Sequence, residues 1–539
     1  MPTQRIQFKE WLPDQPSILD TVSEANNVIP LAIGYGPFKS AVNYSGAATE
    51  DLNNCFAAKL DNDVFIFAGG ASKLFKVDNT DLSMVDESKA GGYTGTNRWQ
   101  FLQFGSLALA SNGSEKIQAY DVNSSTAFAD ASSEAPIAKY ITAVRDFVVA
   151  ANIGAGTAPN KVQWSGINDA TTWTATATSQ SDFQLLPDGG DVTGIVGGEF
   201  GIVFLEKAIV RMSYIGSPLI FQFDTISRNV GCIEGNSIAQ YSGTAYFLSD
   251  DGFYATNGQT LSGIGSEKVD RYFFSNANIG DIDSISAAVD PERNLVIWNY
   301  ANVSGGRSLL IYNFETQKWC EADTDVDYLS TLATSGTTLD GLDSAYNITA
   351  GAFVVGKSYT IRTLGSTDFT LIGAVANTVG VLFTATGAGS GTGVAVDMAA
   401  SAAALKTVDT LVTTLDDRLY KGGKFLFGGV RGTKIITFTG TNATGNIITN
   451  DLEYGYNSVL TLIRPSVDNG SASVSVASRR MLDDAITYGS SVTASEEDRC
   501  SVRSAGRYHR IALTPTGVNW SSAIGMDIDY SEQGTRYGT

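Results

Sequence analysis

Residues 351–358 match the pattern of a phosphate-binding loop, because two glycines enclose four residues and are followed by lysine and serine. A nucleotide site of this kind needs a buried strand before the loop and a helix after it, so that backbone N–H groups converge on phosphate. Here 353–355 (Phe-Val-Val) and 359–363 (Tyr-Thr-Ile-Arg-Thr) both favour strands. The glycine-rich segment 387–393 lacks the same context and is interpreted as a hairpin tip. We therefore expect no nucleotide or other cofactor.

The segment 323–327 (Asp-Thr-Asp-Val-Asp) begins like the calcium-binding loop of an EF-hand. That loop requires glycine at its sixth position and a bidentate glutamate at its twelfth. Tyr328 and Thr334 occupy these positions, so an EF-hand site is rejected. A looser surface cation site in this segment stays open.

The chain has a single histidine, His509, between Arg507 and Arg510. A histidine metal site or a Ser-His-Asp triad would depend on this one residue, which we interpret as a surface or interface side chain. Hydrolysis by a carboxylate pair stays open because Asp and Glu are abundant, but no pair can be chosen from the sequence. We predict that the chain is not an enzyme and has no catalytic, cofactor-binding or metal-binding residues.

The composition is that of a turn-rich, aromatic-rich β protein, with 56 Gly, only 12 Pro, 22 Tyr and 26 Phe in 539 residues. A net charge of −20 repels nucleic acid. No apolar run approaches the ~20 residues of a membrane helix, and no signal peptide is seen, so we expect synthesis in a cytoplasm and no membrane span. The four cysteines have no C-x-x-C spacing and are predicted to be buried free thiols: Cys55, Cys232, Cys320 and Cys500.

Segment 237–265 predicts a β-meander. Gly243-Thr244, Asp251-Gly252 and Asn257-Gly258 separate short aromatic and β-branched runs, and such dipeptides are strong hairpin signals. A meander this short cannot bury both of its faces, so it must be one unit of a repeat.

Similar sets of three strands recur at intervals of roughly 40–50 residues, the range typical of β-propeller blades. Trp173 and Trp319 each close a set and are predicted to wedge between adjacent blades. A two-sheet sandwich is the competing architecture. The six sets are 56–77, 99–121, 140–165, 191–214, 237–265 and 284–314.

The fold class is therefore predicted as all-β, a β-propeller with an inserted small β module and a C-terminal β-sandwich. An extended N-terminal arm, with anchors Trp11, Tyr35 and Phe38, should dock on its own domain or on a neighbouring subunit. After the inserted module the meander is expected to resume at 410–416, 418–420, 425–427 and 434–439. The predicted boundaries are 1–50 for the arm, 51–343 and 398–450 for the propeller, 344–397 for the module and 451–539 for the sandwich.

Arginines gather in the last segment although the chain is acidic. A solvated face with local ion pairs is one interpretation, and a subunit or DNA contact is the other. The residues are Arg479, Arg480, Arg499, Arg503, Arg507, Arg510 and Arg536.

Several stretches resemble tail proteins of short-tailed bacteriophages. They are WLPDQP…NNVIP…GYGPF within 11–38, LSDDGFYATNGQTLSGIGSEKV at 248–269, and the ending from Arg503 to Gly534. The segment 356–393 is similar to a small β module found in phage virion proteins. In the ending the resemblance rests on Arg503, Gly506, Arg507, Tyr508, Trp520, Gly525, Asp527, Asp529, Tyr530 and Gly534.

The resemblance implies a tail nozzle (tail tube) protein of the β-propeller type. Copies of such a protein form a homo-oligomeric ring, usually a hexamer, beneath the portal and adaptor rings, and tail fibre or tail needle proteins are further partners. The location would be the virion tail. The channel would retain the genome and conduct it during DNA ejection without sequence-specific binding. Carboxylates that line such a channel would repel phosphates, so that DNA slides.

Two other functions stay open. A host-receptor or glycan-binding propeller of the tail tip would use exposed Trp and Tyr as stacking platforms. A hydrolase that degrades the cell wall would need an active site, which the sequence does not reveal.

Overall fold

The computed structural model describes residues 2–61, 63–79, 81–95, 97–176, 178–333, 347–397 and 425–532. Strands make up 52% and helices 4% of the structure, so the predicted all-β class is confirmed. The chain divides into two compact units. The larger contains 1–60, 65–332 and 425–539, and the smaller contains 61–64 and 333–424.

Six sets of four antiparallel strands each come from one contiguous segment, and their strands pair in chain order; five of them are separate sheets, and the sixth is part of a larger sheet. Blade 1 contains β6 (Leu52–Leu60), β7 (Asp63–Gly70), β8 (Leu74–Val77) and β9 (Met84–Asp86). Blade 2 contains β10 (Gln100–Phe104), β11 (Leu107–Ser111), β12 (Gln118–Asp121) and β13 (Ala129–Asp130), and blade 3 contains β14 (Ala138–Val144), β15 (Phe147–Ile153), β16 (Ala158–Trp164) and β17 (Asp182–Leu185). Blade 4 contains β18 (Val192–Val196), β19 (Gly201–Leu205), β20 (Ile209–Gly216) and β21 (Ile220–Ser227).

Blades 5 and 6 follow the same plan. Blade 5 contains β22 (Ala239–Tyr241), β23 (Thr244–Leu248), β24 (Phe253–Thr256) and β25 (Leu261–Gly263). A helix, α1 (Asp270–Asn276), and a 3-10 turn, η2 (Ile279–Ser284), lead into blade 6, which contains β26 (Ser286–Asp290), β27 (Leu295–Ala301), β28 (Arg307–Asn313) and β29 (Lys318–Thr324).

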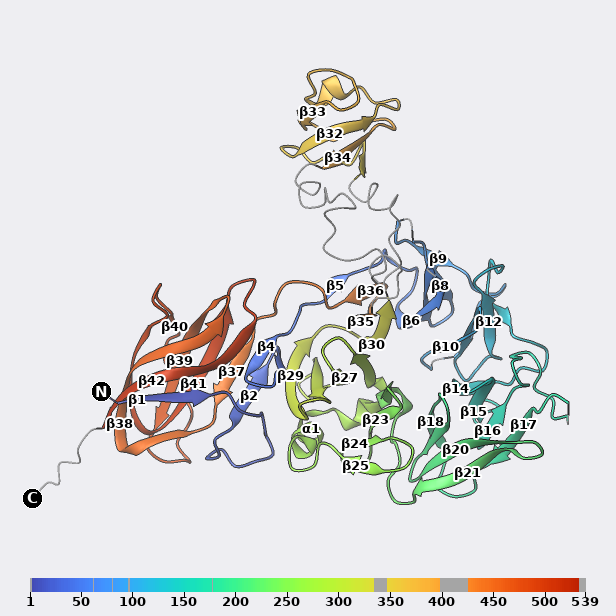
Figure 1. The fold of residues 1–539 in the computed structure, drawn as a ribbon, viewed down its shortest axis with the longest axis horizontal. Coiled ribbons are helices and arrows are strands. Elements are labelled where there is room, and N and C mark those ends of the chain that lie inside the picture. The colour runs from blue at the N-terminus through green and yellow to red at the C-terminus, as the bar shows by residue number, and fades with distance from the viewer. Residues whose placement is uncertain are drawn as a thin grey trace, which may run out of the picture. The chain divides into compact units, whose positions relative to one another are not determined.

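A seventh sheet closes the ring and is assembled from three distant segments. Its strand order is β30 (Tyr328–Ala333), β35 (Phe425–Arg431), β36 (Lys434–Thr437) and β5 (Val42–Asn43). β35 contacts both β26 of blade 6 and β6 of blade 1. The described residues therefore form a seven-bladed propeller, whose sheets surround a common centre in Figure 1.

The two tryptophans predicted as wedges lie between blades. Trp173 is buried in a cluster with Leu109 of blade 2 and Val148 of blade 3. Trp319 packs at a tilt against Phe253 of blade 5, with ring centroids 5.4 Å apart, and its Nε1 donates to the Ile264 carbonyl. Because both faces of a blade are covered by its neighbours, large apolar rings can fill the gap between sheets.

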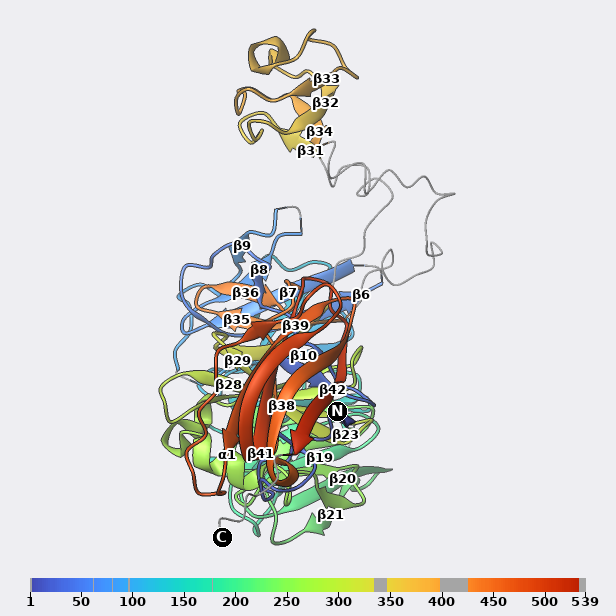
Figure 2. The ribbon, with the colours of Figure 1, turned by 90° about the vertical axis from the view of Figure 1, so that its left-hand side faces the viewer.

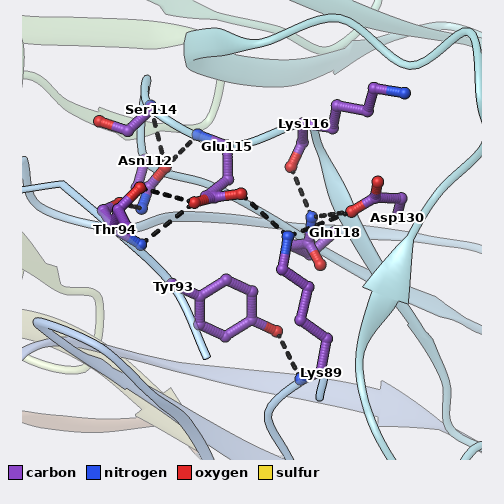
Figure 3. A network of polar contacts seen from close by, with 9 residues as sticks. All are labelled: Lys89, Tyr93, Thr94, Asn112, Ser114, Glu115, Lys116, Gln118 and Asp130. Atoms are coloured by element: carbon purple, nitrogen blue, oxygen red, sulfur yellow. Dashed lines mark hydrogen bonds and ion pairs between the residues drawn. The ribbon is translucent and has the colours of Figure 1, made fainter. Parts of the chain in front are cut away.

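A polar network also joins blades 1 and 2 (Figure 3). The Lys89 ammonium, which follows β9, lies 2.9 Å from a Glu115 oxygen and 3.4 Å from an Asp130 oxygen of blade 2. Glu115 also accepts hydrogen bonds from the backbone and hydroxyl of Thr94. The outer parts of these blades are therefore held by charge-assisted hydrogen bonds in addition to apolar packing.

The C-terminal strands continue the sheet of blade 6. The sheet runs from β29 through β2 (Val22–Asn26) and β37 (Asn446–Thr449) to β41 (Cys500–Thr516), β38 (Leu452–Asp468) and β42 (Ser522–Glu532). β39 (Ser471–Arg479) also pairs with β41, and β40 (Val492–Thr493) pairs with β39. Figure 2 shows the long strands side by side. β37, which the predicted boundary at 451 assigned to the propeller, pairs with β41.

The arm docks on its own chain. β1 (Thr3–Gln7) and β4 (Tyr35–Pro37) pair with β42, β3 (Val28–Pro30) pairs with β4, β2 joins the two domains, and β5 completes blade 7. Trp11, Tyr35 and Phe38 are all buried in the core that the propeller shares with the C-terminal strands. The arm was predicted to dock either on its own domain or on a neighbouring subunit. These three residues dock on domains of their own chain.

The inserted module forms a sheet of its own, in the order β31 (Asn347–Thr349), β34 (Val394–Asp397), β32 (Ser358–Thr363) and β33 (Leu382–Thr384) (Figure 1). A 3-10 turn, η3 (Phe369–Ile372), covers it. Its small core includes Phe353, Tyr359, Phe369 and Phe383.

Candidate functional site

Two regions of the described chain concentrate unusual contacts: the junction between arm and propeller, and the mouth of the propeller axis. At the junction, Asp14 of the WLPDQP motif caps α1 from outside, because its carboxylate accepts two backbone N–H groups at 2.8 and 2.9 Å. Trp11 packs edge-on against Tyr272, 5.1 Å between ring centroids. Lys268, at the end of the 248–269 stretch, forms a 2.7 Å ion pair with Glu10. The opening motif therefore contacts α1 and Lys268, which follow blade 5 in the chain.

The GYGPF segment joins the same core to the C-terminal strands. Tyr35 pairs with Ala523 of β42, and its hydroxyl donates to the Lys9 carbonyl at 2.8 Å. Gly34 has φ +70°, and a Cβ there would lie 2.2 Å from the Ala523 carbonyl oxygen, so only glycine fits. The opening, middle and final stretches that resemble tail proteins thus form one connected core.

Glu321 lies at the seam between propeller and C-terminal domain, where β2 runs between β29 and β37. Its backbone carbonyl accepts from Asn27 at 2.9 Å, and its carboxyl accepts the Tyr272 hydroxyl. Burial raises the pKa of Glu321 to about 7 against the Tyr272 hydrogen bond, and the neighbouring Glu24 and Asp323 raise it further. This carboxyl is protonated far more readily than an ordinary one.

The aspartates of the calcium-like segment face different partners. Asp323 accepts from the Asn26 and Asn27 side chains at 3.0 and 3.1 Å. Asp325 pairs with Arg431 at 2.7 Å, and Asp327 accepts the backbone N–H of residue 432 at 2.7 Å. These aspartates stabilise the seam and blade 7 through separate contacts. Among the described residues, no group of three side chains that could ligate a metal occurs.

The phosphate-loop pattern at 351–358 is a turn that leads into β32, a strand. Phe353 is buried in the module core, whereas Val354 and Val355 are exposed. The strand predicted from the sequence after this pattern is present, and the helix that a phosphate site needs is not found at that position.

His509 is buried in the C-terminal domain, and its interpretation as a surface or interface residue is wrong. Its Nε2 lies 2.7 Å from the Ser458 hydroxyl and its Nδ1 lies 2.6 Å from the Ser478 hydroxyl. Burial lowers the pKa of His509 to about 4, so the imidazole is neutral. Its strand position, which faces the core, was the signal missed. With two serines as its ring partners, it lacks the carboxylate of a triad.

Most of the clustered arginines belong to ion pairs. Asp451 is buried between Arg479 and Arg510, at 2.5 and 3.0 Å. Burial opposes the charge of Asp451, but the hydrogen bonds from both arginines lower its pKa. Arg507 and Arg499 pair with glutamates at 2.7 and 2.8 Å. This is the local ion-pair interpretation; Arg536 lies outside the described residues.

All four cysteines are buried free thiols, as predicted. All seven tryptophans are buried as well, which contradicts the exposed Trp platforms of the glycan-binding alternative. In the described residues, no helix is long and apolar enough to cross a membrane.

The mouth of the propeller axis was not predicted. Polar side chains at the starts of the innermost strands converge there on a cavity of about 180 Å³. Arg98, just before β10, donates to the Asn54 side chain at 3.1 Å and to the Leu329 carbonyl at 2.7 Å, and its guanidinium lies 4.9 Å from the Tyr328 ring centroid. Its Nε is buried without a partner, and burial lowers the pKa of Arg98 to about 10.

Glu234 also lines this cavity. It precedes blade 5 and is the N-cap residue of the short turn η1 (Gly235–Ser237). Its Oε1 accepts the backbone and side-chain N–H groups of Asn236 at 3.1 and 3.0 Å. Burial raises the pKa of Glu234, the Asn236 bond and Lys139 lower it, and Asp283 raises it. Acidic and basic side chains at the starts of four blades (blades 2, 3, 5 and 6) thus line one cavity.

No family model and no curated protein matches the chain. The WD40 domain of Neurospora crassa Pan2 is similar over 54% of this chain and 87% of that chain, at 8% identity and a TM-score of 0.33. A protein from Desulfotomaculum acetoxidans is similar over 50% and 84%, at 15% identity and a TM-score of 0.30. The propeller assignment follows from the sheet order, and likenesses at these TM-scores add nothing about function.

Proposed function

We propose that the chain is a structural subunit of a bacteriophage tail nozzle, a ring of copies whose channel retains the DNA genome and conducts it during ejection. The observation that carries the proposal is the connected core built by the three stretches that resemble tail proteins. Asp14 caps α1, and Tyr35 pairs with Ala523, so segments hundreds of residues apart in sequence meet in space. A resemblance spread over one structural core is more specific than the same matches scattered over separate modules.

The acidic charge fits this role. At −20, the chain repels phosphate, and a channel lined by its carboxylates would let DNA slide. We expect carboxylates at the bore of the assembled ring. A cryo-EM map in which lysine and arginine line the bore would contradict this part of the proposal.

Native mass spectrometry of the full chain, alone and with its neighbouring tail protein, tests the assembly. Six copies of the 57.0 kDa chain would give a ring of about 342 kDa, and closed rotational symmetry is what a channel requires. A ring in either condition supports the proposal. A monomer in both conditions would contradict it.

The receptor-binding alternative loses its tryptophan platforms, because all seven tryptophans are buried, and of its two stacking residue types only tyrosine, such as the exposed Tyr241, remains. Binding of the isolated chain to host-surface polysaccharide would restore it.

A further inference from the structure

Oppositely charged side chains line the axial cavity but do not pair with each other. Arg98 and Lys139 supply positive charge, and Glu234, Asp281 and Asp283 supply negative charge. Within the described chain, none of the five forms an ion pair with another. Asp281 and Asp283 lie at the exposed rim, while Arg98 and Glu234 are partly buried. Buried charges in proteins are normally paired. Because the lining of this cavity keeps its positive and negative side chains apart, it suits a ligand that carries both charges and can pair with both kinds of side chain.

The charged groups are held in place by their own contacts. Arg98 is fixed by Asn54 and the Leu329 carbonyl and stacks on Tyr328, yet no carboxylate touches it. Glu234 uses only Oε1 in its bonds to Asn236, and its Oε2 accepts no hydrogen bond within the described residues. Such fixed and unsatisfied groups lose little entropy when a ligand arrives.

The size of the cavity limits the ligand. About 180 Å³ has room for roughly six water molecules and is smaller than the pockets that hold drug-sized ligands. We propose that the mouth of the propeller axis binds a small zwitterion of the α-amino acid type. Its carboxylate lies toward Arg98 and Lys139, and its ammonium group lies toward Glu234, with Asp283 at the rim. This site depends on the propeller alone and not on ring assembly.

Isothermal titration calorimetry of the full chain with glycine and L-glutamine tests the proposal, with acetate and methylammonium as the separate halves of the zwitterion. At least one amino acid should bind at least tenfold more tightly than either half, because only the zwitterion satisfies both signs of charge. Failure of both amino acids to bind, or equal binding of acetate or methylammonium, would overturn the proposal.

Two variants assign the binding to this cavity. Glu234→Gln keeps an oxygen for Asn236 and removes the charge, and Lys139→Met keeps the aliphatic stem and removes the ammonium. Each should weaken amino acid binding about tenfold. Glu199→Gln, a matched change at an exposed residue of the β18–β19 turn, should leave it unchanged. Thermal melting verifies that each variant folds, and if Glu234→Gln does not fold, Lys139→Met decides. Wild-type binding in the folded cavity variants would overturn the assignment.

Discussion

The six contiguous blades and the joints completed by the arm bring their strands together in different ways. In blade 5, four strands pair with their neighbours in sequence across tight turns. In the arm joints, which we define as blade 7 and the β29–β2–β37 seam, paired strands come from opposite parts of the chain. Local pairing is set by turn chemistry, while non-local pairing needs specific side chains and tight backbone fits to fix its register. The stability of the joints should therefore depend on a few named contacts.

The largest expected effect comes from removing the arm. A chain that starts at Asp51 loses β5, the seam strand β2, and the buried Trp11, Tyr35 and Phe38. Loss of a buried aromatic side chain alone costs about 3–5 kcal/mol, and a whole domain is stable by about 5–15 kcal/mol. We expect no cooperatively folded protein, measured by soluble yield and calorimetry. A cooperative transition like that of the full chain would show that the joints are dispensable.

Gly429→Ala sharpens the comparison at blade 7. A Cβ at this position in β35 would lie 2.1 Å from the backbone oxygen of Tyr328, so β30 must shift. We expect a loss of about 3 kcal/mol in denaturant unfolding. The matched change in a contiguous blade is Gly201→Ala, where the nearest atoms belong to side chains at 3.1 and 3.3 Å. It should cost less than about 1 kcal/mol, and equal losses would contradict the contrast.

Glu321→Gln tests the seam through pH. The folded-state pKa of Glu321, about 7, exceeds its ordinary value of 4.5, so the folded state binds the extra proton. The contribution of Glu321 to stability is therefore present below pH 4.5 and is lost as pH rises through 7. The variant should match the wild type near pH 4 and exceed its free energy of unfolding by up to about 3 kcal/mol at pH 8. Urea titrations at several pH values measure this difference, and a constant offset would refute the assignment.

The smallest effect is expected from removing the inserted module. Residues 347–397 have their own sheet and core, so a Gly-Ser linker in their place should alter the unfolding of the larger unit by less than about 0.5 kcal/mol. Calorimetry of the chain that lacks the module measures the change in its unfolding. A large loss would show that the module supports the joints.

The sequence was informative where structure is local. The three inner strands of six blades were predicted because turn residues separate apolar runs. The outer strands were not, since strands such as β17 (Asp182–Leu185) are exposed along their length and carry no burial pattern. Blade 7 was predicted only in part: 425–427 and 434–439 overlap β35 and β36, while 410–416 and 418–420 lie outside the described residues. Its partners β30 and β5 lie far away in sequence.

The candidate sites divide in the same way. Rejection of the phosphate loop rested on its local strand pattern, and β32 follows it. The axial cavity could not be found, because Arg98, Lys139 and Glu234 follow no common spacing and meet only when the blades close. His509 was misplaced since flanking arginines suggested the surface, although the alternation of β41 turns its ring inward.

The pairing of β1 with β42 constrains the order in which strands can pair during synthesis of the chain. Thr3 hydrogen-bonds to Asp529, a partner 526 residues later. At about 5–20 residues per second, a ribosome needs roughly 25–100 s between making the first strand and making its partner. The six contiguous blades can form during this wait, because their strands emerge in pairing order. The arm strands β2 and β5 can pair earlier, with β29, β37 and β36, but β1 has to remain unpaired until β42 (Ser522–Glu532) is translated, so its docking follows the formation of the propeller.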